Sequence, residues 1–239
     1  MFRSPFIEAF CIADPAFLEK LGLKLPEEAC EVLRDPINFL NTKYQGRRVI
    51  KSHLPFQFLP PKLLDTCKVV YVARNPKDCA TSFYHHNLNV KGHSFVGNFE
   101  EFLILFEDGL SIFGGYWDHL RQGWALRDHP NLKFLWFENM KVDQRVAVDE
   151  LCEFLNHPLS EELKGRLCEH VKFDNMKKSV FSNFSAGIVP PEKQFVRKGE
   201  VGDWRNHFND ETDEKWNKWI DENVKGTGLE NVPHFKQAK

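Results

Sequence analysis

The stretch RRVIKSHLPFQFLPPKLLDTCKVVYVARNPKDCATSFYHH, from Arg47 to His86, carries the patterns from which the fold is predicted. Its longest apolar run, Lys68–Ala73, is nearly continuous, as expected of a strand buried on both faces of a parallel sheet. The shorter run Val49–His53 starts with two β-branched residues and predicts a strand that presents polar side chains at its end. Between the two runs, Pro60–Leu64 predicts a short helix.

The junction after the longer run has the features of an anion-binding helix start. Asn75 can cap the helix, and Pro76 suits the first helical position because its missing N–H would have no partner there. Arg74 is therefore predicted to lie where backbone N–H groups and the helix dipole favour an anion. Ser82 follows about two turns later on nearly the same side of the helix, roughly 10 Å along its axis. Arg74 and Ser82 could thus span an extended anionic ligand.

Apolar spacing predicts further helices and one more buried strand. Asn98 and Glu101 have the spacing of a capping box at the start of a helix that continues through Phe106. The remaining predicted elements are helices over 26–33, 116–126, 145–155 and 161–171 and a strand over 132–137. Because strands alternate with helices, we predict an α/β fold with a parallel sheet and helices on both faces, in one domain over residues 1–239.

Composition bounds the class of function. With a net charge of −2 and a pI of about 6.6, the chain offers no global electrostatic reason to bind nucleic acid, so any anion site must be local. Six cysteines without CxxC spacing predict free thiols in a reducing compartment. Neither a signal-peptide pattern nor a long apolar window is found, and we expect a soluble, cytoplasmic protein that does not engage a membrane.

Two motifs are specific enough to indicate a family. The first is KSHLP at Lys51–Pro55, followed by VVYVARNPKD at Val69–Asp78 and then Ser82. The second is FVRKG at Phe195–Gly199, followed by GDW at Gly202–Trp204. In this order they resemble the motifs of cytosolic sulfotransferases, which transfer a sulfuryl group from 3′-phosphoadenosine 5′-phosphosulfate (PAPS) to a hydroxyl or amine. The resemblance implies a P-loop-like parallel sheet flanked by helices, PAPS as co-substrate, and the hydroxyl of a small apolar acceptor, phenol-like or sterol-like.

His53 is the candidate general base. A hydroxyl is a poor nucleophile until its proton is removed, and an imidazole that titrates near neutrality suits that task. An isolated histidine more often has a structural role, and its place in the KSH motif is what favours catalysis. Lys51 would share a strand face with His53 and could neutralise charge on the transferred group and leaving phosphate. The alternative for Lys51 is a solvated surface lysine.

The resemblance assigns the 3′-phosphate of the cofactor to five residues. Arg74 and Ser82 come from the first motif, and Arg197, Lys198 and the backbone N–H of Gly199 come from the second. Guanidinium groups bind phosphate through bidentate, charge-assisted hydrogen bonds, and glycine lets the backbone approach closely. An Arg-Lys pair alone would usually be a surface feature, so this assignment depends on the flanking motif.

Three departures from the family pattern affect these expectations. Phe173 matches a family phenylalanine that stacks on adenine, but Val171 stands where relatives commonly have threonine. Phe137 stands where they usually have tyrosine. Each lost hydrogen bond predicts cofactor binding weaker by about 0.5 to 1.5 kcal/mol. The segment matching the family's dimerisation motif, Arg205–Glu214, keeps its outer charges but has Asn209-Asp210 in the middle, so a family-style homodimer is left open.

The resemblance also predicts a missing unit. Family members begin their sheet with a strand, a loop resembling YPKSGTTW and a helix, and this loop cradles the 5′-phosphosulfate. No such segment occurs in the 239 residues. We therefore expect the N-terminal strand-loop-helix unit to be absent, and the chain by itself to be catalytically inactive or nearly so and marginally stable.

The sequence leaves two other classes of function as alternatives. One is a catalytically inactive sulfotransferase remnant, or a truncated isoform, that binds nucleotide weakly or regulates a partner. The other is a nucleotide kinase of related fold, which is disfavoured because the sequence has no GxxxxGK[ST] motif and no evident Mg²⁺-binding pair. No metal site is predicted. The identity of the acceptor is not readable from the sequence, because loops build the acceptor pocket.

Overall fold

The structure is a computed structural model that describes residues 8, 19, 27–43, 46–90, 93–178 and 196–236. Phe195 of the second motif lies outside the described residues. The chain divides into two compact units. The first unit comprises residues 1–54, 86–96 and 177–197, and the second unit comprises residues 55–85, 97–176 and 198–239.

The second unit alternates strands with helices in the order that the sequence predicts. Its described strands are β1 (Val69–Ala73) and β2 (Leu132–Trp136). Its helices include α5 (Leu63–Thr66), α6 (Pro76–Asn89), α7 (Phe99–Glu107), α8 (Tyr116–Ala125), α9 (Phe137–Val142), α10 (Gln144–Phe154), α11 (Glu161–His170), α12 (Phe173–Lys178) and α13 (Asp210–Val224). Short 3₁₀ turns cover Phe56–Phe58, Asp203–Asn206 and Pro233–Phe235. The last residues of α6 and α12 belong to the first unit.

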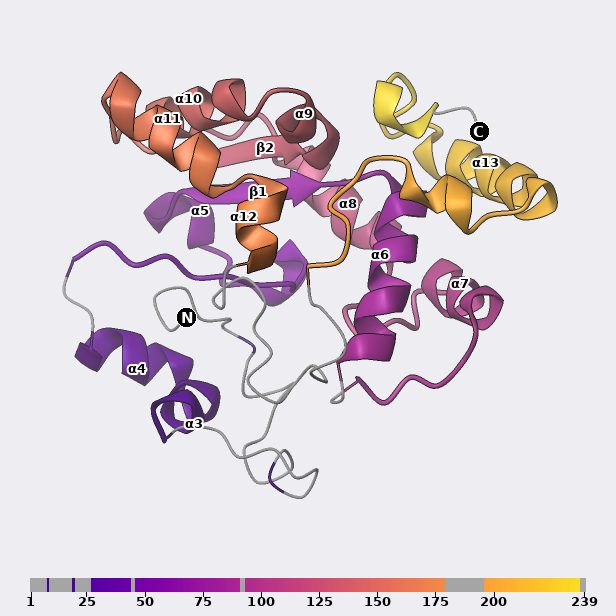
Figure 1. The fold of residues 1–239 in the computed structure, drawn as a ribbon, viewed down its shortest axis with the longest axis horizontal. Helices are drawn as coiled ribbons and strands as arrows, with labels where there is room; N and C mark the ends of the chain where they lie inside the picture. The colour runs from indigo at the N-terminus through magenta and orange to yellow at the C-terminus, as the bar shows by residue number, and fades with distance from the viewer. Residues whose placement is uncertain are drawn as a thin grey trace. The chain divides into compact units, whose positions relative to one another are not determined.

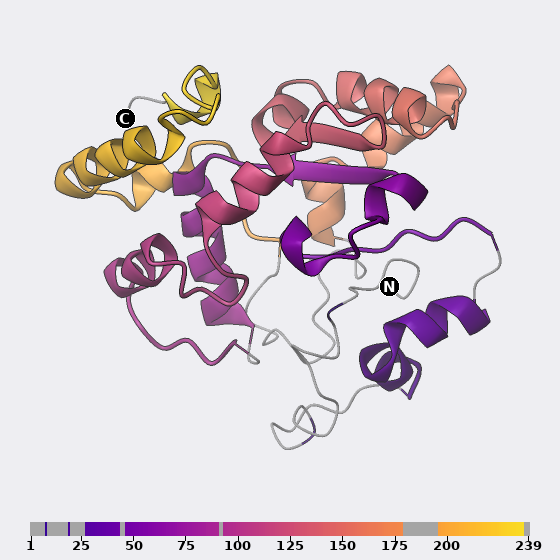
Figure 2. The same cartoon turned by 180° about the vertical axis from the view of Figure 1, so that it is seen from behind.

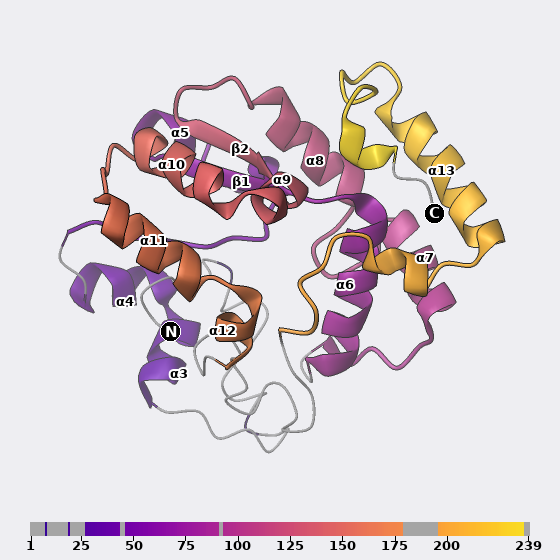
Figure 3. The ribbon, with the colours of Figure 1, turned by 45° about the horizontal axis from the view of Figure 1, so that its top comes forward.

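Strands β1 and β2 pair in parallel, with Val69 opposite Leu132 and Ala73 opposite Trp136. Figure 1 shows α6 leaving the end of β1, so the Arg74 junction lies at the carboxyl end of a parallel strand. After β2 the chain continues into α9 and α10, and α10 packs alongside α11 (Figure 3). This arrangement confirms the predicted α/β fold class with a parallel sheet and flanking helices.

One face of β1 is covered by α8, which crosses the strand pair when seen from behind (Figure 2). A side chain at Gly123 of α8 would collide with the ring of Tyr71, since a Cβ there would lie 2.6 Å from Cε2. The prediction that β1 is buried on both faces is wrong, because Val70 and Val72 are 39% and 51% exposed. An apolar run permits burial of both faces of a strand, but the elements that pack against the strand determine which faces are buried.

The core of the second unit is rich in aromatic side chains. A cluster of buried residues joins the ends of both strands to α8, α13 and the C-terminal turn, and it comprises Ala73, Trp117, Leu120, Trp136, Ile220, Val224, Leu229, Val232 and Phe235. The rings of Trp117 and Phe235 meet edge to face with centroids 5.6 Å apart. The cluster holds the carboxyl ends of β1 and β2 in place, where the candidate nucleotide residues begin.

The first unit contains α3 (Glu27–Arg34) and α4 (Pro36–Lys43). The predicted strand Val49–His53 is not formed. Within the described part of the chain, Lys51 is the single residue of this stretch that makes a β-bridge. Val49 and Ile50 are 57% and 50% exposed. Two β-branched residues favour an extended backbone, but a strand also requires a paired neighbour along its length.

No described helix has both the length and the apolar composition needed to cross a bilayer. Within the same residues, no group of three or more His, Cys, Asp and Glu side chains is placed to hold a metal ion. The five described cysteines are free thiols.

Candidate active site

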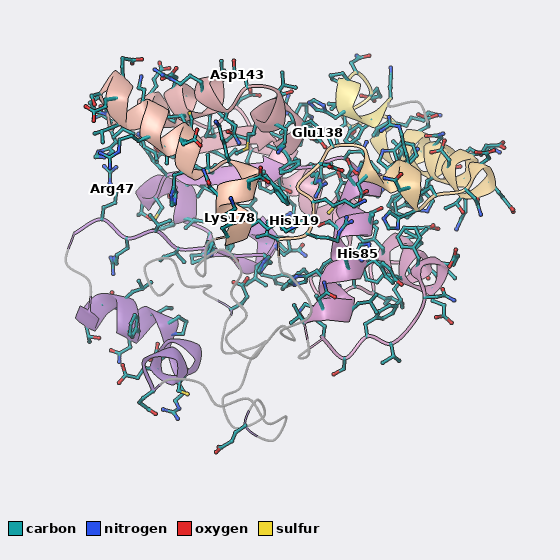
Figure 4. The ribbon with its side chains drawn as sticks, in the orientation of Figure 1. Arg47, His85, His119, Glu138, Asp143 and Lys178 are labelled. Atoms are coloured by element: carbon teal, nitrogen blue, oxygen red, sulfur yellow. The ribbon has the colours of Figure 1, made fainter. Side chains whose placement is uncertain are left out.

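The strand-to-helix junction is built by Asn75. Its side-chain oxygen accepts the backbone N–H groups of Lys77 at 2.9 Å and Asp78 at 3.3 Å, which confirms the predicted cap. Its own N–H donates to Oε1 of the buried Glu138, labelled in Figure 4, at 2.8 Å. These N–H groups already have partners, so they are not open to an anion. The charge for an anion must come from side chains, and Arg74 is the first of them.

Arg74 is held in place by contacts that leave part of its guanidinium unused. Its Nη2 donates to the carbonyl of Glu200 at 2.9 Å, and its guanidinium carbon lies 4.5 Å from the centre of the Phe137 ring. Its backbone carbonyl accepts the hydroxyl of Tyr116 at 2.7 Å. The Nε–H group is buried without a partner among the described residues. Because a buried donor without an acceptor is unfavourable, this group has the properties expected of a ligand contact.

Gly199 rests against the ring of Phe173. Its φ is +65°, and a Cβ at this position would lie 2.5 Å from Cδ2 of Phe173 and 2.8 Å from Cε2. Only glycine fits here without displacing the ring or straining the backbone. Since Glu200 binds Arg74 and follows Gly199 directly, Arg74, Phe137, Phe173 and Gly199 form one connected group, which we call the nucleotide cluster.

The other predicted phosphate ligands differ in their surroundings. Lys198 is 40% exposed, and its Nζ lies 2.5 Å from Oδ1 of Asp203, so it would have to share this carboxylate with a phosphate. Ser82 is half-buried on α6. Arg197 is half-buried and belongs to the first unit, whereas Lys198 begins the last segment of the second.

Asp78 fixes the second motif to α6, a role that the sequence reasoning missed. It is 1% exposed, and its two carboxylate oxygens accept the N–H of Gly202 at 2.6 Å and of Trp204 at 3.2 Å. The two family motifs are therefore joined by direct hydrogen bonds. Asp78 belongs to the first motif, but its partners are more than 120 residues away, and no local pattern marks such a pairing.

His53 has a carboxylate partner in the first unit. Oε1 of Glu8 accepts the backbone N–H of His53 at 2.6 Å and lies 2.9 Å from its Nδ1. Glu8 is 3% exposed, whereas the His53 side chain is 37% exposed. Lys51 is exposed. Because the strand predicted here is not formed, the expectation that Lys51 and His53 share a strand face loses its basis, while the partner of His53, 45 residues away, was not predicted.

Two further histidines, His86 and His93, are close enough to His53 for its charge to affect their pKa values. The rings of His86 and His93 meet with centroids 4.8 Å apart. Burial, with added repulsion from His93 and His53, lowers the pKa of His86 to about 4, and burial and His53 also lower the pKa of His93. His86 is therefore neutral at physiological pH.

The second unit thus has Arg74 and Phe137 directly after its two parallel strands, and the first unit has a histidine–carboxylate pair. Residues 3–228 match the sulfotransferase domain family. The chain belongs to the sulfotransferase family. Human sulfotransferase 1E1 is 36% identical over 189 residues, which cover 76% of this chain and 64% of the relative. Mouse sulfotransferase 1B1 is 34% identical over 201 residues, which cover 82% of this chain and 67% of the relative.

The chain spans about two thirds of the length of the curated relatives it matches. Solved structures agree on the fold. Retinol dehydratase in complex with androsterone and the inactive cofactor PAP has a TM-score of 0.84 at 32% identity, covering 97% of this chain and 72% of its own. Mouse SULT7A1 complexed with PAP has a TM-score of 0.72 at 24% identity, covering 82% of this chain and 73% of its own, and supports the fold alone.

Proposed function

We propose that the protein transfers a sulfuryl group from PAPS to the hydroxyl of a small apolar acceptor, phenol-like or sterol-like. The observation that carries this proposal is the nucleotide cluster, in which the buried Nε–H of Arg74 has no partner among the described residues. Family membership supports the reaction class. A relative of similar fold was solved with androsterone and PAP, and another structure of retinol dehydratase was solved with retinol and PAP.

The residues of the nucleotide cluster fit the chemistry of PAPS. Arg74 offers a guanidinium to the 3′-phosphate, with Ser82, Arg197 and Lys198 as further proposed ligands. Phe173 and Phe137 offer aromatic faces to the adenine, and the small Gly199 leaves the backbone accessible beside the Phe173 ring. When bound, PAPS supplies the activated sulfuryl group.

The acid-base part of the reaction belongs to His53 in this proposal. Its imidazole would take the proton of the acceptor hydroxyl, and Lys51 would neutralise charge on the leaving phosphate. The apolar acceptor, the single-domain organisation and a cytoplasmic location remain proposals that rest on the resemblance to cytosolic sulfotransferases.

Thermal denaturation with PAP (3′-phosphoadenosine 5′-phosphate) tests the binding half of the proposal. At a ligand concentration of about 100 times Kd, binding to the native state should raise Tm by about 5 to 10 °C. Adenosine 5′-phosphate, which lacks the 3′-phosphate, is the matched control and should give a smaller shift at the same concentration. Equal shifts for both nucleotides, or no shift with either, would refute the assignment of a 3′-phosphate site.

A further inference from the structure

Glu8 holds His53 at two points. The same carboxylate oxygen, Oε1, accepts the backbone N–H of His53 at 2.6 Å and lies 2.9 Å from Nδ1 of its ring. Glu8 is almost completely buried, at 3% exposure, whereas the His53 side chain is 37% exposed. A fixed, buried carboxylate therefore faces one nitrogen of a solvent-accessible imidazole and restrains both the main chain and the ring.

This geometry selects one tautomer of the imidazole. An ionised carboxylate can only accept hydrogen bonds, so Nδ1 of His53 must carry the proton and donate it. In the neutral ring the lone pair then lies on Nε2. Burial raises the pKa of Glu8, but the hydrogen bonds from His53 and from the N–H of Glu8 itself, together with attraction to His53, bring the pKa below its usual value, so Glu8 is ionised at neutral pH.

The second oxygen of Glu8 leaves His53 as the described partner of the carboxylate. Oε2 is buried and has no hydrogen-bond partner among the described residues. A buried carboxylate usually satisfies both oxygens, because an unpaired buried acceptor is costly. Glu8 instead directs its described hydrogen bonds to His53 through Oε1.

We propose that Glu8 is the positioning residue of the transfer reaction, holding His53 in the tautomer whose Nε2 accepts the proton of the acceptor hydroxyl. This inference rests on the proposed function. As the hydroxyl oxygen bonds to sulfur, its proton passes to Nε2. The bond between sulfur and the bridging oxygen of the 5′-phosphate breaks, and PAP leaves with the electron pair. The resulting imidazolium faces the carboxylate of Glu8 across Nδ1–H, which stabilises the new charge.

The test reads the tautomer directly and does not depend on activity. Nitrogen-15 NMR of histidine-labelled protein, with His53 assigned by its absence in His53→Gln, should show Nδ1 protonated and Nε2 unprotonated above neutral pH. In Glu8→Met the acceptor is gone, and His53 should become a mixture of both tautomers. Glu138→Met is the matched control: Glu138 is also buried, accepts one backbone N–H and has an unpartnered Oε2 among the described residues. It should leave the His53 signals unchanged.

Kinetics of the protein expressed from its full natural transcript supply the second readout. Glu8→Gln keeps the shape of the side chain and removes its charge, so kcat should fall by about 10- to 100-fold while KM for the acceptor stays the same. A wild-type His53 protonated on Nε2, or identical tautomers in wild type and Glu8→Met, would overturn the role of Glu8. If Glu8→Met does not fold, the wild-type tautomer and the Glu8→Gln kinetics still decide. If the protein from the full natural transcript shows the predicted tautomers but transfers no sulfuryl group, the proposed function is overturned instead.

Discussion

Replacing Gly199 with alanine should disable the nucleotide cluster through a single methyl group. The added Cβ would lie 2.5 Å from Cδ2 and 2.8 Å from Cε2 of Phe173, far inside van der Waals contact. The φ of +65° adds backbone strain of about 1 to 2 kcal/mol for any residue with a Cβ. The ring of Phe173 must move, and it is the ring proposed to stack on adenine. We expect the Kd for PAP to rise by about tenfold or more, equivalent to about 1.4 kcal/mol.

Gly114→Ala separates backbone strain from the collision with the ring. Gly114 also has a positive φ, +81°, but nothing lies within 4 Å of its Cβ position. Both variants should therefore lose stability through strain, whereas Gly199→Ala alone should lose affinity for PAP in isothermal titration calorimetry. Unchanged PAP binding in Gly199→Ala, or an equal loss in Gly114→Ala, would refute the reasoning that places the adenine beside Phe173.

Three further outcomes follow from the described contacts. Arg74→Ala and Arg197→Ala should each weaken the binding of PAP much more than the binding of adenosine 5′-phosphate in isothermal titration calorimetry, because each arginine is assigned to the 3′-phosphate. Equal losses for both nucleotides would place the arginines elsewhere. Asp78→Ala removes two buried charge-assisted hydrogen bonds and should lower the free energy of unfolding by about 2 to 4 kcal/mol in urea denaturation. A loss below about 0.5 kcal/mol would show that these bonds do not anchor the second motif. Because the pKa of Glu8 is lower than its usual value of 4.5, the ionised carboxylate stabilises the fold above pH 4.5. The difference in unfolding free energy between wild type and Glu8→Gln should therefore shrink as the pH falls below 4.5, and a difference independent of pH would contradict the lowered pKa.

The elements confirmed from sequence are those defined by local patterns. The Asn98–Glu101 capping box is formed, with hydrogen bonds of 2.8 and 2.9 Å in both directions. Asn75 caps α6 as predicted, and β1 and β2 begin and end within one residue of their apolar runs. These features require only neighbours in sequence, so composition and spacing suffice to find them.

Most of the features that the sequence could not supply depend on partners that are distant in the sequence. Val49–His53 has side chains that favour a strand, but a strand forms only where another segment pairs with it, and the sequence of the run does not specify that partner. The carboxylate of Glu8 meets His53 across 45 residues, and Asp78 meets Gly202 across 124. The Asn75 cap was foreseen, but not its consequence, which is that it uses the N–H groups expected to bind an anion.

Transfer of a radiolabelled sulfuryl group from PAPS tests the proposed reaction itself. The protein, expressed from its full natural transcript, is incubated with radiolabelled PAPS and a panel of phenols and sterols, in wild-type form and as His53→Ala. We expect a labelled sulfate ester with at least one acceptor, and turnover lower by about 10² to 10⁴ in His53→Ala, because the general base is lost. Wild-type turnover in His53→Ala would remove His53 from the reaction, and absence of label transfer to any acceptor by the wild-type protein would contradict the proposed function.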